Sequence, residues 1–256
     1  MEILVCVKRV PVTGGRIGLT DDELDVDTRY LGFTVSPHEE CGVEEAVRLI
    51  EAHGGSTTVL TLGPTLAEEQ LRDAMAMGAN RAVLIEAEGP EWDGGATAGA
   101  IARVVADRRD AGVTYDLLLF GNESADAGGY QVGIRVAHLL DLPCVTGVKH
   151  LEIRDGTAVA RREGPGGFEI YEIPLPGVIT VKEGINLPRY PSIPGRLRAK
   201  KAPVERVQLD APPPGLEKVR LRLPPGRDKQ VEILGDGATG IERAIDVLRQ
   251  IGVMSS

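Results

Sequence analysis

The amino-acid sequence predicts an α/β fold: a doubly wound, mostly parallel sheet with an antiparallel hairpin extension and an extended C-terminal arm. Apolar runs of strand length alternate with segments of helical periodicity over roughly the first 140 residues, which is typical of strand–helix–strand units. The pair Asp155-Gly156 between two further runs is a strong hairpin signal. After Arg189 the chain is rich in proline and has too few apolar residues to form a core of its own.

The first half of the chain alternates strands with helices. We expect strands over residues 2–7, 57–62, 81–85 and 115–120. The last of these is almost wholly apolar, as expected when both faces of a parallel sheet are covered. We expect helices around residues 43–50, 65–78, 97–109 and 130–140. The apolar residues of the first helix share one face, and Thr65 and Glu68 have the spacing of a capping box.

The second half becomes antiparallel and then extended. Residues 148–153 and 157–162 flank the hairpin turn, and residues 168–173 and 177–181 are expected to continue the antiparallel section. A small hairpin is expected within residues 16–25, a charged strand at 217–223 and a final helix at 241–251. These patterns divide the chain into an α/β domain, residues 1–188, and a docking loop with a C-terminal arm, residues 189–256. We expect the arm to pack on the main domain or on a partner subunit.

Composition excludes several classes of protein. A net charge of −9 argues against a nucleic-acid-binding protein, whose domain would usually be strongly basic. The three cysteines show no paired metal spacing and fit a reducing compartment. No apolar run approaches the roughly 20 residues of a membrane span, and the N-terminus enters a strand without a signal peptide. We therefore expect a cytoplasmic protein that is not inserted in a membrane.

The segment from Glu183 to Lys201 has the features of a docking element. It places Pro188, Pro191 and Pro194 at three-residue intervals around Ile193. Prolines at this spacing disfavour helix and central strand, so we expect a stiff surface loop that holds Ile193 outward. A linker that leaves the domain would have a similar composition. The segment ends on a basic cluster, which on an acidic chain favours contact with a partner protein: Arg196, Arg198, Lys200 and Lys201.

A Gly-rich loop between Phe120 and Gly133 is the best candidate for an anion site. It lies between an apolar strand and a helix, and its small residues would let backbone amides approach a ligand. The N-terminus of the following helix attracts anions. Neither the standard dinucleotide fingerprint nor a P-loop is present. A loop of this kind can also be purely structural, and Asp126 before a helix is commonly an N-cap.

Three blocks of sequence resemble the β subunit of electron transfer flavoproteins. The first is Asn186-Leu-Pro-Arg-Tyr-Pro-Ser192 followed by Ala199-Lys-Lys201. The others are Ile3-Leu-Val-Cys-Val-Lys-Arg-Val-Pro11, and Val59-Leu-Thr-Leu-Gly-Pro64 leading into residues 71–80. The resemblance extends over residues 1–201 in order, and the last 55 residues match weakly.

The resemblance implies that residues 1–188 form an adenine-nucleotide-binding, Rossmann-like domain. Members of the family hold AMP, or FAD in electron-bifurcating members. By position, the cofactor-binding residues would be Cys6, Ser36, Leu62, Asn122, Asp126, Ala127, Gly128, Gly129, Tyr130, Gln131 and Val132. Cys6, Ser36 and Leu62 would contact adenine and ribose, while Asp126, Gln131 and Val132 would lie at the phosphate end. Cys6 is also plausible as a residue that only packs in the core. Gln131 is polar and lies at the start of a helix, so it has no such packing role to explain it.

Departures from the family pattern leave the nucleotide open between AMP and a second FAD. This chain has Val12 where members often have Asp, and Ser36-Pro37 where they have Asn-Pro. Bifurcating members tend to have Thr at the position of Gly129, although Gln131-Val132 agrees with them. We favour AMP.

The resemblance further implies an electron carrier and not an enzyme, in keeping with the lack of any catalytic motif in the sequence. The chain would pair with an α subunit that holds most of a redox FAD. It would carry electrons from flavin dehydrogenases, such as the acyl-CoA dehydrogenases of fatty acid oxidation, to a quinone oxidoreductase. Ile193 would be the anchor in the dehydrogenase, and the basic cluster would steer an acidic partner. The alternatives are a bifurcating subunit with its own FAD that uses NADH, and a stand-alone adenine-nucleotide sensor.

Overall fold

The computed structural model describes residues 1–12, 14–15, 17–210, 215–225 and 232–254. The chain divides into two units, Met1–Val219 and Arg220–Ser256. The first unit contains all the residues expected to bind a nucleotide or a partner dehydrogenase. The second contains helix α6 (Thr239–Gln250), which confirms the helix expected at the end of the chain.

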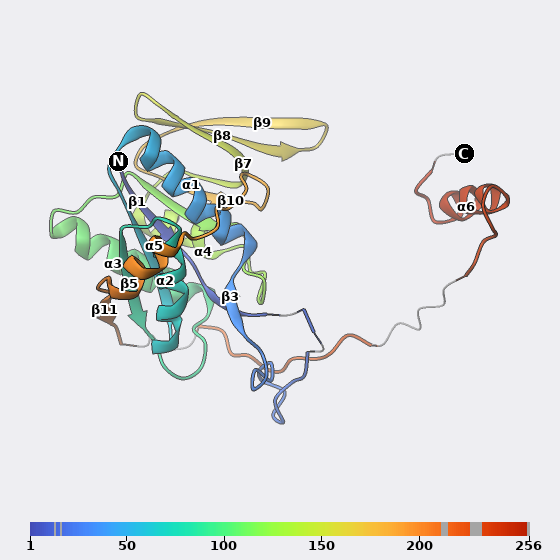
Figure 1. Ribbon diagram of the computed structural model, residues 1–256, viewed down its shortest axis with the longest axis horizontal. Helices are drawn as coiled ribbons and strands as arrows, with labels where there is room; N and C mark the ends of the chain where they lie inside the picture. The colour runs from blue at the N-terminus through green and yellow to red at the C-terminus, as the bar shows by residue number, and fades with distance from the viewer. Residues whose placement is uncertain (13, 16, 211–214, 226–231, 255–256) are drawn as a thin grey trace. The chain divides into compact units, whose positions relative to one another are not determined.

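Nine of the described strands form one sheet in the first unit (Figure 1). In spatial order they are β11 (Glu205–Gln208), β5 (Arg81–Glu86), β4 (Ser56–Gly63), β1 (Glu2–Cys6), β6 (Leu117–Gly121), β10 (Gly177–Val181), β7 (Cys144–Arg154), β8 (Thr157–Gly164) and β9 (Gly167–Pro174). Neighbours from β11 to β7 are parallel, whereas β7, β8 and β9 are antiparallel. The expected doubly wound, mostly parallel sheet and its hairpin extension are therefore confirmed.

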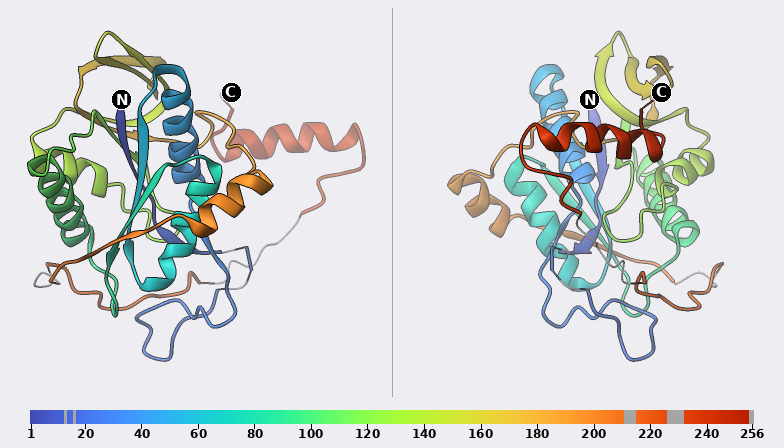
Figure 2. Two further views of the ribbon diagram at one scale, coloured as in Figure 1. Left: turned by 60° about the vertical axis from the view of Figure 1, so that its left-hand side comes forward. Right: turned by 90° about the vertical axis from the view of Figure 1, so that its right-hand side faces the viewer.

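Helices cover both faces of the parallel part of the sheet. Helices α1 (Pro37–His53) and α2 (Glu68–Met77) lie on one face, and α3 (Gly94–Asp110) and α4 (Val132–Leu140) lie on the other, as Figure 2 shows by colour. Side chains alternate along β1, so that Ile3 and Val5 join the first core while Leu4 and Cys6 join the second. Burial on both faces explains why these strands appear in the sequence as continuous apolar runs.

The strand order reverses at β1. From β1 the chain winds outward through β4 to β5, and it then crosses back to β6 on the other side of β1. The connection that leaves β1 therefore leads through α1 to one side of the sheet, and the connection that leaves β6 leads through α4 to the other side. In open α/β sheets this switch point is where ligands bind.

The expectation of a stiff loop over the whole segment 183–201 is wrong in its second half. Residues Ile193–Lys201 form helix α5, which packs on α2. The backbone N–H of Gly195 donates to Ser192 Oγ at 3.1 Å, so Ser192 is the N-cap. Pro194 lies in the first turn, where its missing N–H removes no helical hydrogen bond. The three-residue proline spacing disfavours only the interior of a helix, not its start.

Four further expectations about secondary structure need correction. Strand β10 is parallel to β6 and β7, although it was expected in the antiparallel section. Thr65 does not cap a helix, because its N–H and hydroxyl bind Glu88 and a short 3₁₀ turn, η1 (Thr65–Ala67), precedes α2. Residues 217–223 form no strand. The hairpin within 16–25 is reduced to a bridge between Leu19 and Val26, and residue 16 lies outside the described residues.

Three short strands, two in a separate antiparallel sheet and one at the edge of the main sheet, are not predicted from the sequence. The pair β2 (Arg9–Pro11) and β3 (Phe33–Val35) has only three residues in each strand, and β11 is four residues long and mostly polar. Because α5 and β11 belong to the first unit, part of the expected arm packs on the main domain. The boundary at residue 188, as a limit of independent folding, stays a prediction. Within the described ranges, no helix is long and apolar enough to cross a membrane.

Candidate functional site

The residues expected to contact a nucleotide come together at the switch point of the sheet. Cys6 ends β1, Asn122 follows β6, and Leu62 near the end of β4 packs against the core that contains Cys6. Ser36 precedes α1, and its Oγ accepts a hydrogen bond of 3.1 Å from the backbone N–H of Ala125. That bond joins the start of α1 to the Gly-rich loop after β6. The topology thus assembles side chains from four separate segments at one edge.

Helix α4 begins directly after the Gly-rich loop. Gln131 occupies its N-cap position, and no side-chain hydrogen bond caps the helix. By contrast, Asp93 caps α3, accepting hydrogen bonds from the N–H groups of Gly95 and Ala96 at 2.7 and 2.8 Å. Free N–H groups in the first turn of α4, together with the helix dipole, favour a bound anion.

Only some glycines of the loop are required by the fold. A Cβ on Gly121 would lie 2.6 Å from Glu39 Cγ, and a Cβ on Gly133 would lie 2.9 Å from Thr180 Cγ2. Gly128 has a φ of 54°, a left-handed conformation that favours glycine. Gly129 has only ordinary contacts, so neither space nor strain demands a glycine there. The loop therefore has a structural role, but the fold does not require Gly129, whose small size leaves room for a ligand.

Lys8 joins the two loops that border the edge. Its ammonium group forms ion pairs with Glu91, which follows β5, and at 2.6 Å with Asp126 of the Gly-rich loop. Burial opposes ionisation of Asp126, but its hydrogen bond and ion pair with Lys8 outweigh this effect and lower its pKa. Asp126 also accepts from the N–H of Ala127, and it caps no helix, because α4 begins at Val132. The N-cap interpretation of Asp126 is therefore wrong.

Gln131 has a structural partner that the sequence analysis missed. Its Oε1 accepts a hydrogen bond of 2.8 Å from Arg135 Nε, one helical turn later. Its side chain also lies against Gly94, where a Cβ would approach Gln131 Cδ to 3.0 Å. The side chain is therefore positioned between the starts of α3 and α4. Its place at the phosphate end of a bound nucleotide stays a prediction.

Glu39 belongs to this edge but was not identified from the sequence. It lies in the first turn of α1, is 7% exposed, and accepts a 2.8 Å hydrogen bond from the backbone N–H of Lys8. Burial raises the pKa of Glu39 to about 8, and hydrogen bonds from the Lys8 and Ser36 backbones offset only part of this. A neutral Glu39 does not repel an anion. The capping-box spacing of Ser36 and Glu39 was the available signal.

Cys6 behaves as a packing residue. It is buried in the core beneath α3 and α4, and burial raises the pKa of its thiol far above the usual value. A protonated, buried thiol is a poor nucleophile. Among the described residues, no group of three or more His, Cys, Asp or Glu side chains could hold a metal ion.

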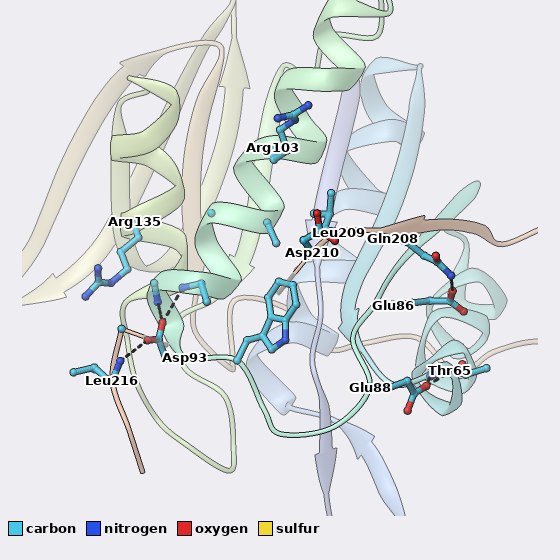
Figure 3. Close-up of a pocket in the computed structure, with 16 residues that line it drawn as sticks. Thr65, Glu86, Glu88, Asp93, Arg103, Arg135, Gln208, Leu209, Asp210 and Leu216 are labelled. Atoms are coloured by element: carbon cyan, nitrogen blue, oxygen red, sulfur yellow. Dashed lines mark hydrogen bonds between the residues drawn. The ribbon is translucent and has the colours of Figure 1, made fainter. Parts of the chain in front are cut away.

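A large cavity lies beside the switch point (Figure 3). It has a volume of about 1320 Å³ and is lined by side chains of both charges. Arg103 and Arg135 lie on α3 and α4, and Glu86 and Glu88 lie at and just after the end of β5. None of the residues expected to bind a nucleotide lines it. At its α3 end, Asp93 already binds the first amides of the helix and the N–H of Leu216. The features that favour an anion belong to the neighbouring edge and not to this cavity.

The docking segment, residues 183–201, presents apolar side chains to solvent. Ile193 is 76% exposed, in agreement with the expectation that it is held outward, and Leu187 and Tyr190 are 91% and 95% exposed. The basic cluster lies on α5, and none of its members forms a salt bridge with another described residue: Arg196, Arg198, Lys200 and Lys201. The segment therefore combines apolar and positively charged groups on one short stretch. Its role in docking stays a prediction.

Comparison with known proteins gives one consistent family. The model of the electron transfer flavoprotein domain matches residues 24–212. The chain is 34% identical to the electron transfer flavoprotein subunit beta of Bacillus subtilis, over 97% of this chain and 98% of the relative. The proteins of the same name from Syntrophomonas wolfei and Mycobacterium bovis are 33% and 36% identical, over 91% and 81% of this chain and 90% and 79% of theirs.

Proposed function

Because the chain belongs to the electron transfer flavoprotein family, we propose that it is the β subunit of a cytoplasmic, heterodimeric electron carrier. Relatives named as beta subunits imply an α-subunit partner. The carrier receives electrons from flavin dehydrogenases, such as acyl-CoA dehydrogenases, and delivers them to a quinone oxidoreductase. The chain itself has no active site in this account. Family membership over nearly the whole length of the chain is the observation that carries the proposal.

In this account the switch point holds AMP, which has a structural role. Three features of the edge fit an adenine nucleotide: the uncapped start of α4, a small residue at Gly129, and acidic side chains whose charge is suppressed or paired. Backbone amides around Gly129 and Val132 would bind the phosphate, while Cys6, Ser36 and Leu62 would enclose adenine and ribose. The bound nucleotide would fix the Gly-rich loop against α1.

The redox chemistry belongs to an FAD that the two subunits share and that the α subunit mostly holds; when bound, this group accepts and releases the transferred electrons. The residues of this chain bring the partner close enough for transfer. Ile193 inserts into an apolar pocket of the dehydrogenase, and the basic cluster of α5 attracts an acidic surface around it.

The second unit binds the α subunit. Helix α6 has no buried residue; its apolar side chains Ile241 and Leu248 are exposed, and so is Ile251 directly after it. A helix with such an apolar face is stable when the face is covered by another protein surface. This assignment also explains why the arm lacks a core of its own.

The proposal is tested by co-expressing the chain with the FAD-binding α subunit of an electron transfer flavoprotein. The purified protein should be a heterodimer whose flavin is bleached by an acyl-CoA dehydrogenase and its acyl-CoA substrate. A nucleotide-bound chain that forms no heterodimer would favour the sensor alternative. A heterodimer that NADH reduces directly, with no dehydrogenase present, would favour bifurcation.

A further inference from the structure

Arg189, in the middle of the docking segment, is held by two carboxylates of α1. Its Nε and Nη2 donate to the two oxygens of Glu44 at 2.8 and 3.0 Å, and its Nη1 and Nη2 donate to those of Glu51 at 2.6 and 2.9 Å. Its backbone N–H also donates to Glu44 at 3.1 Å. One residue of the segment is thus fixed to one helix by five hydrogen bonds.

The chemistry of this contact makes it both strong and directional. A guanidinium group is planar and binds a carboxylate through two parallel hydrogen bonds, which fixes orientation as well as distance. The side chain of Glu44 is 6% exposed, so Arg189 is the group that compensates its buried charge. Hydrogen bonds to Glu51 and Glu44 raise the pKa of Arg189 well above its usual value.

Apolar packing contributes little to holding this part of the segment. Leu187 and Tyr190, which flank Arg189, are almost fully exposed. Between the segment and the ends of α1 and α2 lies a groove of about 450 Å³, lined by Arg189 and Tyr190 together with Val47 and Met77. Polar contacts with α1 therefore keep the backbone of the segment in place on this side. Asn186 Nδ2 donates to the carbonyl of Cys41 at 3.0 Å and to Glu45 at 2.8 Å, and the contact of Arg189 is the one nearer to Ile193.

A second anchor lies on the other side of Ile193. Gly195 approaches α2 so closely that a Cβ would lie 2.6 Å from the carbonyl oxygen of Ala76. Arg72 Nη1 on α2 donates a 2.5 Å hydrogen bond to the carbonyl of Ala199 in α5. Ile193 is therefore held between an anchor to α1 and an anchor to α2, four residues after one and two residues before the other.

We infer that Arg189 is the positioning residue of the docking segment: by joining it to Glu44 and Glu51, it sets the direction in which Ile193 meets the partner dehydrogenase. The inference rests on the proposed function, since it presupposes that Ile193 docks. A segment that is already ordered loses less conformational entropy on binding than a mobile one. Releasing Arg189 therefore weakens docking and leaves the transfer step after docking unchanged.

The test uses the heterodimer with three variants and one control. Arg189→Lys keeps the charge but loses the fork, Glu51→Gln removes the exposed half of the contact, and Ile193→Ala removes the anchor. Arg103→Lys is the control: it replaces an exposed guanidinium group whose Nε donates to both oxygens of Asp107 on α3, on the opposite face of the sheet. The Michaelis constant for the heterodimer is measured with an acyl-CoA dehydrogenase and octanoyl-CoA, and dithionite serves as a reductant that needs no docking. Hydrogen exchange of residues 187–197 reports the mobility of the segment.

We expect Arg189→Lys to raise KM about tenfold and Glu51→Gln about threefold, with kcat and reduction by dithionite unchanged. Amide exchange in residues 187–197 should accelerate in the same order, and Arg103→Lys should alter none of these values. Should Arg189→Lys fail to fold, Glu51→Gln carries the test, because Glu51 is exposed. If Ile193→Ala raises KM while Arg189→Lys and Glu51→Gln change neither KM nor amide exchange, the inference about Arg189 is wrong, and the docking role of Ile193 is retained. An unchanged KM in Ile193→Ala overturns the docking role and the inference together.

Discussion

The buried carboxyl of Glu39 makes the stability of the fold depend on pH. Burial raises its pKa from about 4.5 to about 8 in the folded chain. Between these two pH values the folded state therefore holds a proton that the unfolded state has lost. The stability contributed by Glu39 is full below pH 4.5 and is lost as the pH rises through 8. At about 1.4 kcal/mol for each pH unit, the loss amounts to up to about 5 kcal/mol.

Substitution of Glu39 by Gln removes this dependence, because an amide of the same shape does not titrate. Urea unfolding of both proteins is measured at pH 5, 6.5 and 8. Between the lowest and the highest pH, the free energy of unfolding of the variant should rise by several kcal/mol relative to that of the wild type. Glu172→Gln, at an exposed position of β9, serves as the control and should follow the wild type. The reasoning is refuted if the difference between Glu39→Gln and the wild type stays constant within about 0.5 kcal/mol across this range.

Three further substitutions test separate parts of the account. Ile193→Ala should raise KM for a cognate acyl-CoA dehydrogenase by more than tenfold while size-exclusion chromatography still shows the heterodimer; an unaltered KM would count against the anchor. Gly121→Ala places a Cβ 2.6 Å from Glu39 Cγ, so it should lower the free energy of unfolding by about 1–3 kcal/mol; a variant as stable as the wild type in urea would show that the edge is not closely packed. Gln131→Ala should weaken AMP binding about tenfold in calorimetry, as expected for one lost hydrogen bond to a charged group; equal affinity would remove Gln131 from the phosphate end.

Much of the sheet could be predicted because its strands are buried on both faces. Such strands appear as apolar runs, and the periodicity of the helices between them is equally clear. Strands β2, β3 and β11 escaped prediction because three or four residues of mixed polarity carry too little pattern. Helix α5 was missed for a different reason: Pro194 lies in a first turn, where proline is tolerated, and Ser192 caps that turn.

The candidate site could be predicted only where one segment carries its own signal. The Gly-rich loop and the strand ends were identified because each is a local pattern. The ion pairs of Lys8 with Glu91 and Asp126 join loops that are distant in sequence, and no spacing indicates them. The contact of Arg189 with Glu44 likewise joins residues 145 positions apart. Glu39 was hidden because its burial follows from the close approach of Gly121, which is a property of the packed fold.

The cofactor content of the purified heterodimer tests the central claim most directly. Native mass spectrometry gives the mass of the intact complex, and the visible spectrum with mass analysis of released ligands gives their identity. The account predicts one FAD and one AMP per heterodimer, with the AMP content lowered and the FAD content unchanged in Gln131→Ala. Two FADs and no AMP, or a complex whose β subunit releases no nucleotide, would contradict it.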